Sequence, residues 1–269
     1  MPAPNEITTT QLNRLIGTPD CPVIVDVCID DDFNADPRLI PSALRHPHTD
    51  LPGLAERLKG RPSVVVCQKG KKLSQGVVSW LHGQGLKSEF LAGGNFAWRD
   101  GGLPLVETKI VAFDANGQTR WITRHRPKID RIACPWLIRR FVDRNAAFFF
   151  VGPAEVEAAA KLFSATPFDV EDVAFSHRGD HCTFDTMLDE FNLHTPALDR
   201  MALAIRAADT NRHDLHPVAA GLLAISVGLS RQYRNDHEQL DAGMHLYDGL
   251  YRWARDGFEE GHDWPSVRG

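Results

Sequence analysis

Long hydrophobic runs, a leader-like start and an excess of positive charge are all missing from this chain of 269 residues. No apolar run approaches the ~20 residues that a membrane-spanning helix needs. No N-terminal stretch combines basic residues, an apolar core and a small-residue cleavage site. A formal net charge of −5 argues against general nucleic-acid binding. We therefore expect a cytoplasmic protein that contacts neither a membrane nor nucleic acid.

Paired metal or disulfide motifs are also missing. There is no Cys-x-x-Cys and no His-Glu-x-x-His, and the five cysteines are scattered: Cys21, Cys28, Cys67, Cys134 and Cys182. Reduced thiols in a reducing compartment fit this spacing best. With 43% hydrophobic and 24% charged residues, the chain has the composition of a globular protein and the length for two ordinary domains.

The most informative segment that is present runs from residue 64 to residue 74. Three β-branched residues predict a buried strand that stops at Cys67, and Leu73 to Leu81 has the apolar spacing of a helix. Backbone N–H groups at a helix N-terminus favour anions, and nearby lysines favour a thiolate. The sequence thus predicts Cys67 as the reactive thiol, with an anion-binding loop made of Gln68, Lys69, Gly70, Lys71 and Lys72. The alternative is an inert strand-end cysteine beside a solvated basic loop.

Several motifs surround this loop in a fixed order. Val23–Val27 carries Asp26, Leu39-Ile40-Pro41-Ser42-Ala43 follows, and Ala92-Gly93-Gly94-Asn95-Phe96-Ala97-Trp98 precedes Gly102-Leu103-Pro104. In that order, residues 8–106 resemble a rhodanese (sulfurtransferase) domain. The resemblance implies an α/β domain with a parallel sheet and flanking helices. It also implies that Cys67 is a nucleophile cycling through a persulfide, with a small-molecule or protein sulfur donor and acceptor and no cofactor.

Two positions depart from the family pattern. Cys28 and Gln68 stand where the family usually has arginine, and the segment after Cys67 looks one residue longer. A wider loop suits a tetrahedral oxyanion better than a single sulfur atom. An oxyanion reductase or phosphatase that uses Cys67 therefore remains an alternative to the sulfurtransferase.

The second half predicts a mainly α-helical domain. Apolar residues recur at helical spacing from Cys134 to Val142, from Phe184 to Phe191, and along residues 199–208, 218–229 and 240–254. Residues 148–151 predict a short strand. We expect a rhodanese-like domain over residues 1–107, a linker over 108–119 and the helical domain over 120–269.

Polar residues at the helix ends of this half suggest a metal site. Histidine and carboxylate ligands suit iron, zinc or manganese, and the candidate ligands are Asp130, His177, Asp185 and Asp209. Capping or surface roles are the ordinary alternative for each of them; Asp130 could cap its own helix. Neighbouring arginines offer a second alternative, in which they compensate the carboxylates or bind an oxyanion.

A second resemblance applies to this half. Asp130-Arg131-Ile132-Ala133-Cys134-Pro135-Trp136-Leu137-Ile138-Arg139-Arg140-Phe141, with Ser176-His177-Arg178-Gly179 and Cys182-Thr183-Phe184-Asp185, looks like the C-terminal domain of the ChrB chromate-resistance family over roughly residues 118–256. The resemblance implies a role in chromate or oxidative stress. Some members carry a DNA-binding N-terminal part, so a chromate-responsive regulatory or binding protein is a further alternative, with chromate or another oxyanion as its ligand.

Overall fold

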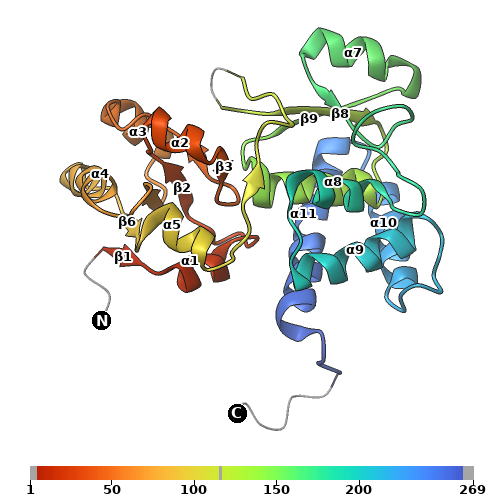
Figure 1. Ribbon diagram of the computed structural model, residues 1–269. Helices are drawn as coiled ribbons and strands as arrows, with labels where there is room; N and C mark the ends of the chain where they lie inside the picture. Colours follow the sequence, from red (N-terminus) through yellow and green to blue (C-terminus); the bar gives the residue numbers. More distant parts are fainter. Residues whose placement is uncertain (1–4, 115–116, 263–269) are drawn as a thin grey trace.

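The computed structural model describes residues 5–114 and 117–262 of the chain. The chain folds into two adjacent parts, an N-terminal α/β domain and a C-terminal domain rich in helices (Figure 1). The expected boundaries at residues 107 and 120 stay a prediction, and residues 115–116 of the expected linker lie outside the described residues. None of the helices in the described part combines the length and the apolar character that crossing a bilayer requires.

A five-stranded parallel sheet forms the centre of the N-terminal domain. Its order is β1 (Glu6–Ile7), β6 (Ser88–Leu91), β5 (Ser63–Val66), β2 (Val23–Asp26) and β4 (Leu44–Arg45). Every residue of β2 and β5 is buried, as expected for central strands covered on both faces. The predicted parallel sheet is confirmed.

Helices cover both faces of this sheet. The five helices described here are α1 (Thr9–Leu15), α2 (Asp30–Ala35), α3 (Leu51–Leu58), α4 (Lys72–Gly83) and α5 (Gly94–Asp100). Leu12 of α1 and Trp98 of α5 belong to the apolar cluster on one face, whereas Leu54 of α3 and Val77 of α4 belong to the cluster on the other. A short antiparallel pair, β3 (Arg38–Leu39) and β7 (Val106–Glu107), closes the domain on the side of the linker.

The C-terminal domain is mainly helical, as predicted. Besides α7, described below, its α-helices in the described part are α6 (Asp130–Leu137), α8 (Thr183–Phe191), α9 (Pro196–Asp209), α10 (Ala219–Gln232) and α11 (Asp236–Arg252). Single π-helical turns extend α6 over Ile138–Val142 and α11 over Trp253–Gly257.

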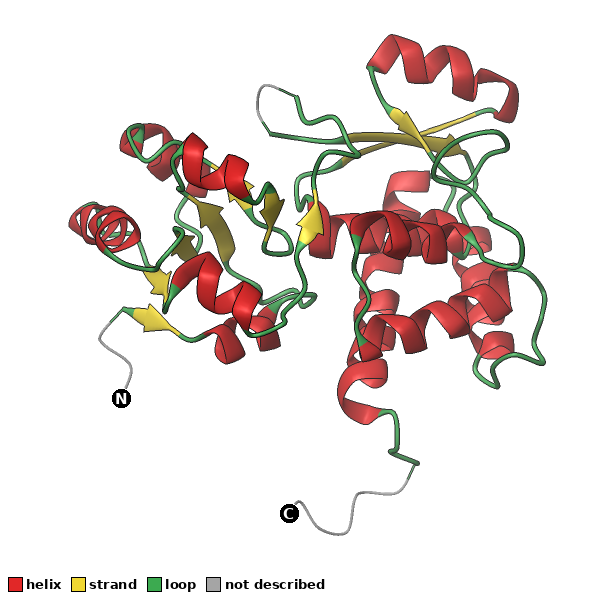
Figure 2. Cartoon of the chain, in the orientation of Figure 1, coloured by secondary structure: helices red, strands yellow, loops and turns green. Residues whose placement is uncertain are grey.

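A small parallel sheet also belongs to this domain, and only one of its strands was predicted. It runs in the order β10 (Thr166–Pro167), β8 (Arg120–Arg124) and β9 (Ala147–Val151) and lies across the helices (Figure 2). Helix α7 (Val156–Phe163) packs on it through Val156, which contacts Ile122 and Ala165. Strand β9 matches the predicted strand at 148–151, while β8 and β10 are additions.

The two domains share one apolar cluster. It includes Leu12, Ile24 and Trp98 from the first domain and Phe141 and Tyr251 from the second. Hydrogen bonds cross the same boundary, from the Ser42 N–H to the Phe141 carbonyl (2.6 Å) and from the Arg144 guanidinium to the Cys21 carbonyl (2.8 Å).

We expect Gly17→Ala to destabilise the chain by about 1–3 kcal/mol. Gly17 has a φ of 79°, and a Cβ there would lie 2.6 Å from the rings of Phe141 and Tyr251. Gly85→Ala is the matched control, because Gly85 has a φ of 75° but a Cβ there would have no neighbour within 4 Å. Urea denaturation measures both. Equal losses would show that the Gly17 contact with the second domain contributes nothing beyond backbone strain.

Candidate functional sites

Cys67 lies where the sequence placed it, directly after β5 and before α4. The side chain is 6% exposed, and its Sγ lies 3.2 Å from the Oγ of Ser74 in the first turn of α4. No side-chain cap accepts a hydrogen bond from the N–H groups at the start of α4. A sulfur atom here faces the positive end of a helix dipole.

Gly93, Gly94 and the first residues of α5 pack against the cysteine loop. The N–H groups of Asn95 and Phe96 donate to the carbonyls of Cys67 (3.1 Å) and Gln68 (3.0 Å). A Cβ on Gly94 would lie 2.0 Å from the Cys67 carbonyl oxygen, and one on Gly70 would lie 2.3 Å from the Leu91 carbonyl oxygen. Only glycine permits this approach of two backbones, so the Gly93-Gly94-Asn95 motif fixes the position of the loop.

Burial raises the pKa of each of the other four cysteines. It raises the pKa of Cys21, Cys134 and Cys182, and it raises that of Cys28 together with the charge of Asp26. These thiols stay protonated near neutral pH and are poor nucleophiles. The lysines of the Cys67 loop are exposed, and within the described residues none forms an ion pair with a carboxylate: Lys69, Lys71 and Lys72.

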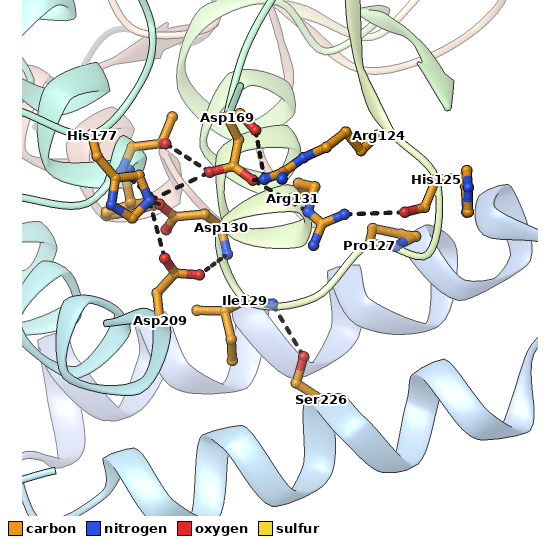
Figure 3. A network of polar contacts seen from close by, with 12 residues as sticks. Arg124, His125, Pro127, Ile129, Asp130, Arg131, Asp169, His177, Asp209 and Ser226 are labelled. Atoms are coloured by element: carbon orange, nitrogen blue, oxygen red, sulfur yellow. Dashed lines mark hydrogen bonds and ion pairs between the residues drawn. The ribbon is translucent and has the colours of Figure 1, made fainter. Parts of the chain in front are cut away.

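The second candidate site is a cluster of carboxylates around His177 in the C-terminal domain (Figure 3). The His177 Nε2 lies 3.2 Å from an oxygen of Asp209, 3.5 Å from one of Asp169 and 3.7 Å from one of Asp130. Single ligand atoms of Asp130, His177 and Asp209 all lie within 4.8 Å of one another, which is compatible with a shared metal ion. Asp130 begins α6, Asp209 ends α9, and the other two come from the segment between β10 and α8.

The structure thus brings together three of the four predicted ligands. Asp185 lies apart from them, because its carboxylate accepts hydrogen bonds from Arg206 (3.0 Å) and from the Cys182 N–H (3.0 Å). Sequence analysis missed Asp169, which follows β10, a strand of two residues that the sequence did not reveal. No periodicity or motif marked it.

Asp130 is fully buried, and its role differs from the capping of its own helix. One oxygen, Oδ2, accepts from the N–H groups of Thr183 (2.6 Å) and Phe184 (3.4 Å), so Asp130 binds the N-terminus of α8. The other oxygen, Oδ1, is buried without a hydrogen-bond partner among the described residues. An unsatisfied buried carboxylate oxygen is costly, and a bound cation would remove that cost.

Among the described residues, arginines form ion pairs with only one of the carboxylates of the cluster. Arg124 and Arg131 lie 3.3 Å and 3.2 Å from the same oxygen of Asp169. Burial opposes ionisation of Asp169, but hydrogen bonds from His177 and Thr183 and the arginine charges lower its pKa overall. Asp130 and Asp209 form no ion pair with an arginine or a lysine within the described part of the chain.

The other three titratable groups of the cluster have raised pKa values. Burial, with the charges of Asp209 and Asp169, raises the pKa of Asp130 well above its ordinary range. Burial and Asp169 raise the pKa of Asp209 as well. The hydrogen bond to Asp169 raises the pKa of His177. Without a cation the cluster holds protons that an ordinary surface carboxylate would release.

Backbone strain precedes the cluster. Ile129 has φ 39° and ψ −102°, an unfavourable conformation for a β-branched residue. The Ser226 Oγ accepts from its N–H (3.2 Å), and the Tyr247 hydroxyl donates to its carbonyl (3.1 Å). Such enforced strain is concentrated at functional sites, and here it sets the position of Asp130.

The fold and the two sites define a two-domain protein: an α/β domain with a parallel sheet and a cysteine loop, followed by a helical domain with a buried histidine–carboxylate cluster. Residues 121–254 match the family described as ChrB, C-terminal domain. This match covers most of the second part of the chain.

Known proteins similar to the chain fall into two groups. "Protein ChrB" from Cupriavidus metallidurans is 32% identical over 133 residues, which cover 49% of this chain and 40% of that protein. The chain therefore spans well under half of this relative. Among solved structures, a rhodanese-related protein from Thermoplasma volcanium is 22% identical (TM-score 0.34, covering 38% of this chain and 97% of that one). A thiosulfate sulfurtransferase from Pseudomonas aeruginosa is 27% identical (TM-score 0.33, covering 39% and 19%).

Proposed function

We propose that the N-terminal domain is a sulfurtransferase that carries sulfur on Cys67. The observation that supports this most is the position of the Cys67 Sγ, at the end of β5 and 3.2 Å from the Ser74 Oγ at the uncapped start of α4. The other four cysteines are held as thiols by burial.

The proposed reaction has two steps. The Cys67 thiolate attacks the outer sulfur of a donor such as thiosulfate, forming a persulfide and releasing sulfite. The persulfide then passes its outer sulfur to an acceptor such as cyanide, which leaves as thiocyanate and restores the thiolate. The N–H groups and lysines of residues 68–72 stabilise the negative charge on the transferred sulfur.

Transfer from thiosulfate to cyanide by the intact chain tests this proposal. The rival reactions at Cys67 are hydrolysis of a phosphate monoester and reduction of an oxyanion. Release of p-nitrophenol from p-nitrophenyl phosphate, or thiol-dependent consumption of chromate, at a rate above that of thiosulfate turnover would favour the rival.

For the C-terminal domain we propose a metal site formed by Asp130, His177 and Asp209, with Asp169 beside it. The convergence of ligand atoms from Asp130, His177 and Asp209 to within 4.8 Å of one another carries this proposal, together with the buried Oδ1 of Asp130, which has no hydrogen-bond partner among the described residues. Carboxylate and imidazole ligands suit iron, zinc or manganese. A bound ion of this kind would supply Lewis-acid or redox chemistry. We place this chemistry in a chromate or oxidative stress response in the cytoplasm, the role implied by the ChrB family.

The protonation of the cluster predicts how stability depends on pH. A carboxyl whose folded pKa is raised holds an extra proton in the native state, so stability falls as the pH rises above its unfolded pKa of about 4. Asp130 and Asp209 act in this direction, and the stabilisation from His177 is lost as the pH rises through its raised folded pKa. Each proton contributes at most about 1.4 kcal/mol per pH unit.

Urea denaturation of the EDTA-treated protein between pH 5 and pH 8 measures this slope. We expect the metal-free protein to lose stability with rising pH and Asp130→Asn to flatten the curve. Added metal should stabilise more at pH 8 than at pH 5, because its binding displaces these protons. A pH-independent stability of the metal-free protein would contradict the protonated cluster.

A further inference from the structure

A cavity of about 250 Å³ lies between the two domains. Its walls are largely apolar and come from both domains, with Phe33 of α2, Ala43 and Leu44 at the start of β4, and Val142 at the end of the π-helical turn. The volume is about eight times the ~30 Å³ that one water occupies in the liquid. It is therefore large enough for a small organic molecule and too apolar to be filled well by water alone.

The polar groups in the cavity wall carry an excess of positive charge. Three arginines line it, Arg45, Arg57 and Arg144, against a single carboxylate, Asp143. The Asp143 carboxylate already accepts hydrogen bonds from the N–H and hydroxyl of Thr119 (2.7 and 2.8 Å) and from the Asn145 N–H (2.9 Å). Arg45 pairs with the exposed Asp30 (2.9 Å), but its buried Nε has no hydrogen-bond acceptor among the described residues.

Arg144 is a cation of the cavity wall that has no carboxylate partner among the described residues. Its guanidinium donates to the Cys21 carbonyl (2.8 Å), and no carboxylate of the described residues lies within ion-pair distance. It is partly buried, and Arg61 and Arg140 are its charged neighbours. Burying a guanidinium among like charges costs free energy unless an anion accompanies it.

We infer that this interdomain cavity binds a small monocarboxylate with an apolar tail. The carboxylate meets the forked donors of Arg144, and the tail lies against Phe33, Ala43 and Leu44. A single negative charge complements the Arg144 guanidinium, which has no ion pair with a carboxylate of the described residues. Inorganic sulfate or phosphate would match the charge and leave the apolar wall uncovered. Because both domains line the cavity, an occupant would also hold them together.

Octanoate is the probe, and titration calorimetry with the full chain is the measurement. We expect saturable binding at one site, with little binding of 1-octanol, which has the same tail and no charge, or of sulfate, which has charge and no tail. Arg144→Met should weaken octanoate binding about tenfold or more, since a charged hydrogen bond is lost. Arg231→Met, which removes an exposed arginine of α10 outside the cavity, should leave the affinity unchanged.

A second variant separates loss of the site from loss of the fold. Ala43→Leu keeps every charge and fills part of the cavity, so it too should weaken octanoate binding while circular dichroism and Tm remain near those of the parent. The proposal is overturned if octanoate does not bind, if sulfate or 1-octanol binds equally well, or if the affinity for octanoate is the same in Arg144→Met and Ala43→Leu as in the parent.

Discussion

Cys67→Ser abolishes sulfur transfer from thiosulfate to cyanide, by ~10³-fold or more, if the proposed reaction is right. A serine hydroxyl cannot form the persulfide, and no other group in the described loop can carry a covalent sulfur. Thiocyanate formation, followed by its iron complex, measures the rate. The size of the effect comes from chemistry, because serine has nearly the shape of cysteine and should leave the fold intact.

Cys28→Ala is the matched control. Cys28 is also a buried cysteine at the carboxyl edge of the sheet, but burial and Asp26 keep it protonated. We expect its variant to retain most of the activity. Limited alkylation near neutral pH, read by mass spectrometry, should label Cys67 before Cys21, Cys134 or Cys182. Faster labelling of another cysteine, or activity that survives in Cys67→Ser, would refute the role of Cys67.

His177→Ala and Asp130→Asn should each lower the affinity for iron, zinc or manganese by about 100-fold or more. Loss of a ligand is expected to exceed the 10–100-fold effect of losing a partner that only orients one. The affinity of the reconstituted chain is measured by competition with a chelator, and the metal content by elemental analysis after dialysis. The parent should hold metal in proportion to protein.

His194→Ala is the control for this experiment. His194 also lies between two aspartates, with Asp189 at 2.9 Å and Asp199 at 3.0 Å, but it is more exposed and lacks the third carboxylate. We expect its variant to bind metal as the parent does. A metal-free preparation that gains no stability from added iron, zinc or manganese would contradict the metal proposal. Charge compensation by Arg124 and Arg131 would then be the explanation for the carboxylate cluster.

Local sequence patterns were sufficient to predict most of the N-terminal domain. The β-branched runs at Val23–Asp26 and Ser63–Val66 became central strands, because a strand buried on both faces is apolar throughout. Thr8 and Gln11 form the capping box that starts α1. The loop around Cys67 could be placed because strand, glycine and helix follow one another within a few residues.

The C-terminal site was less accessible to sequence analysis. Asp130, His177 and Asp209 stood out by their positions at helix ends, but their distance from one another is a tertiary property. Asp185 has an equally polar surrounding in the sequence, and only the fold shows that Arg206 holds it. Asp169 depends on β10, whose two residues carry no periodicity. Strand β8 lies at the start of the range expected to be helical.

The apolar cluster shared by the domains has a consequence for how the chain melts and how it could have evolved. Phe141 and Tyr251 belong to the same apolar cluster as Leu12 and Trp98, so either half alone would expose apolar side chains to water. Heating should give one cooperative transition for both halves. A lineage that exchanged one half for another would have had to remodel this contact at the same time, which ties the inheritance of the cysteine loop to that of the histidine–carboxylate cluster.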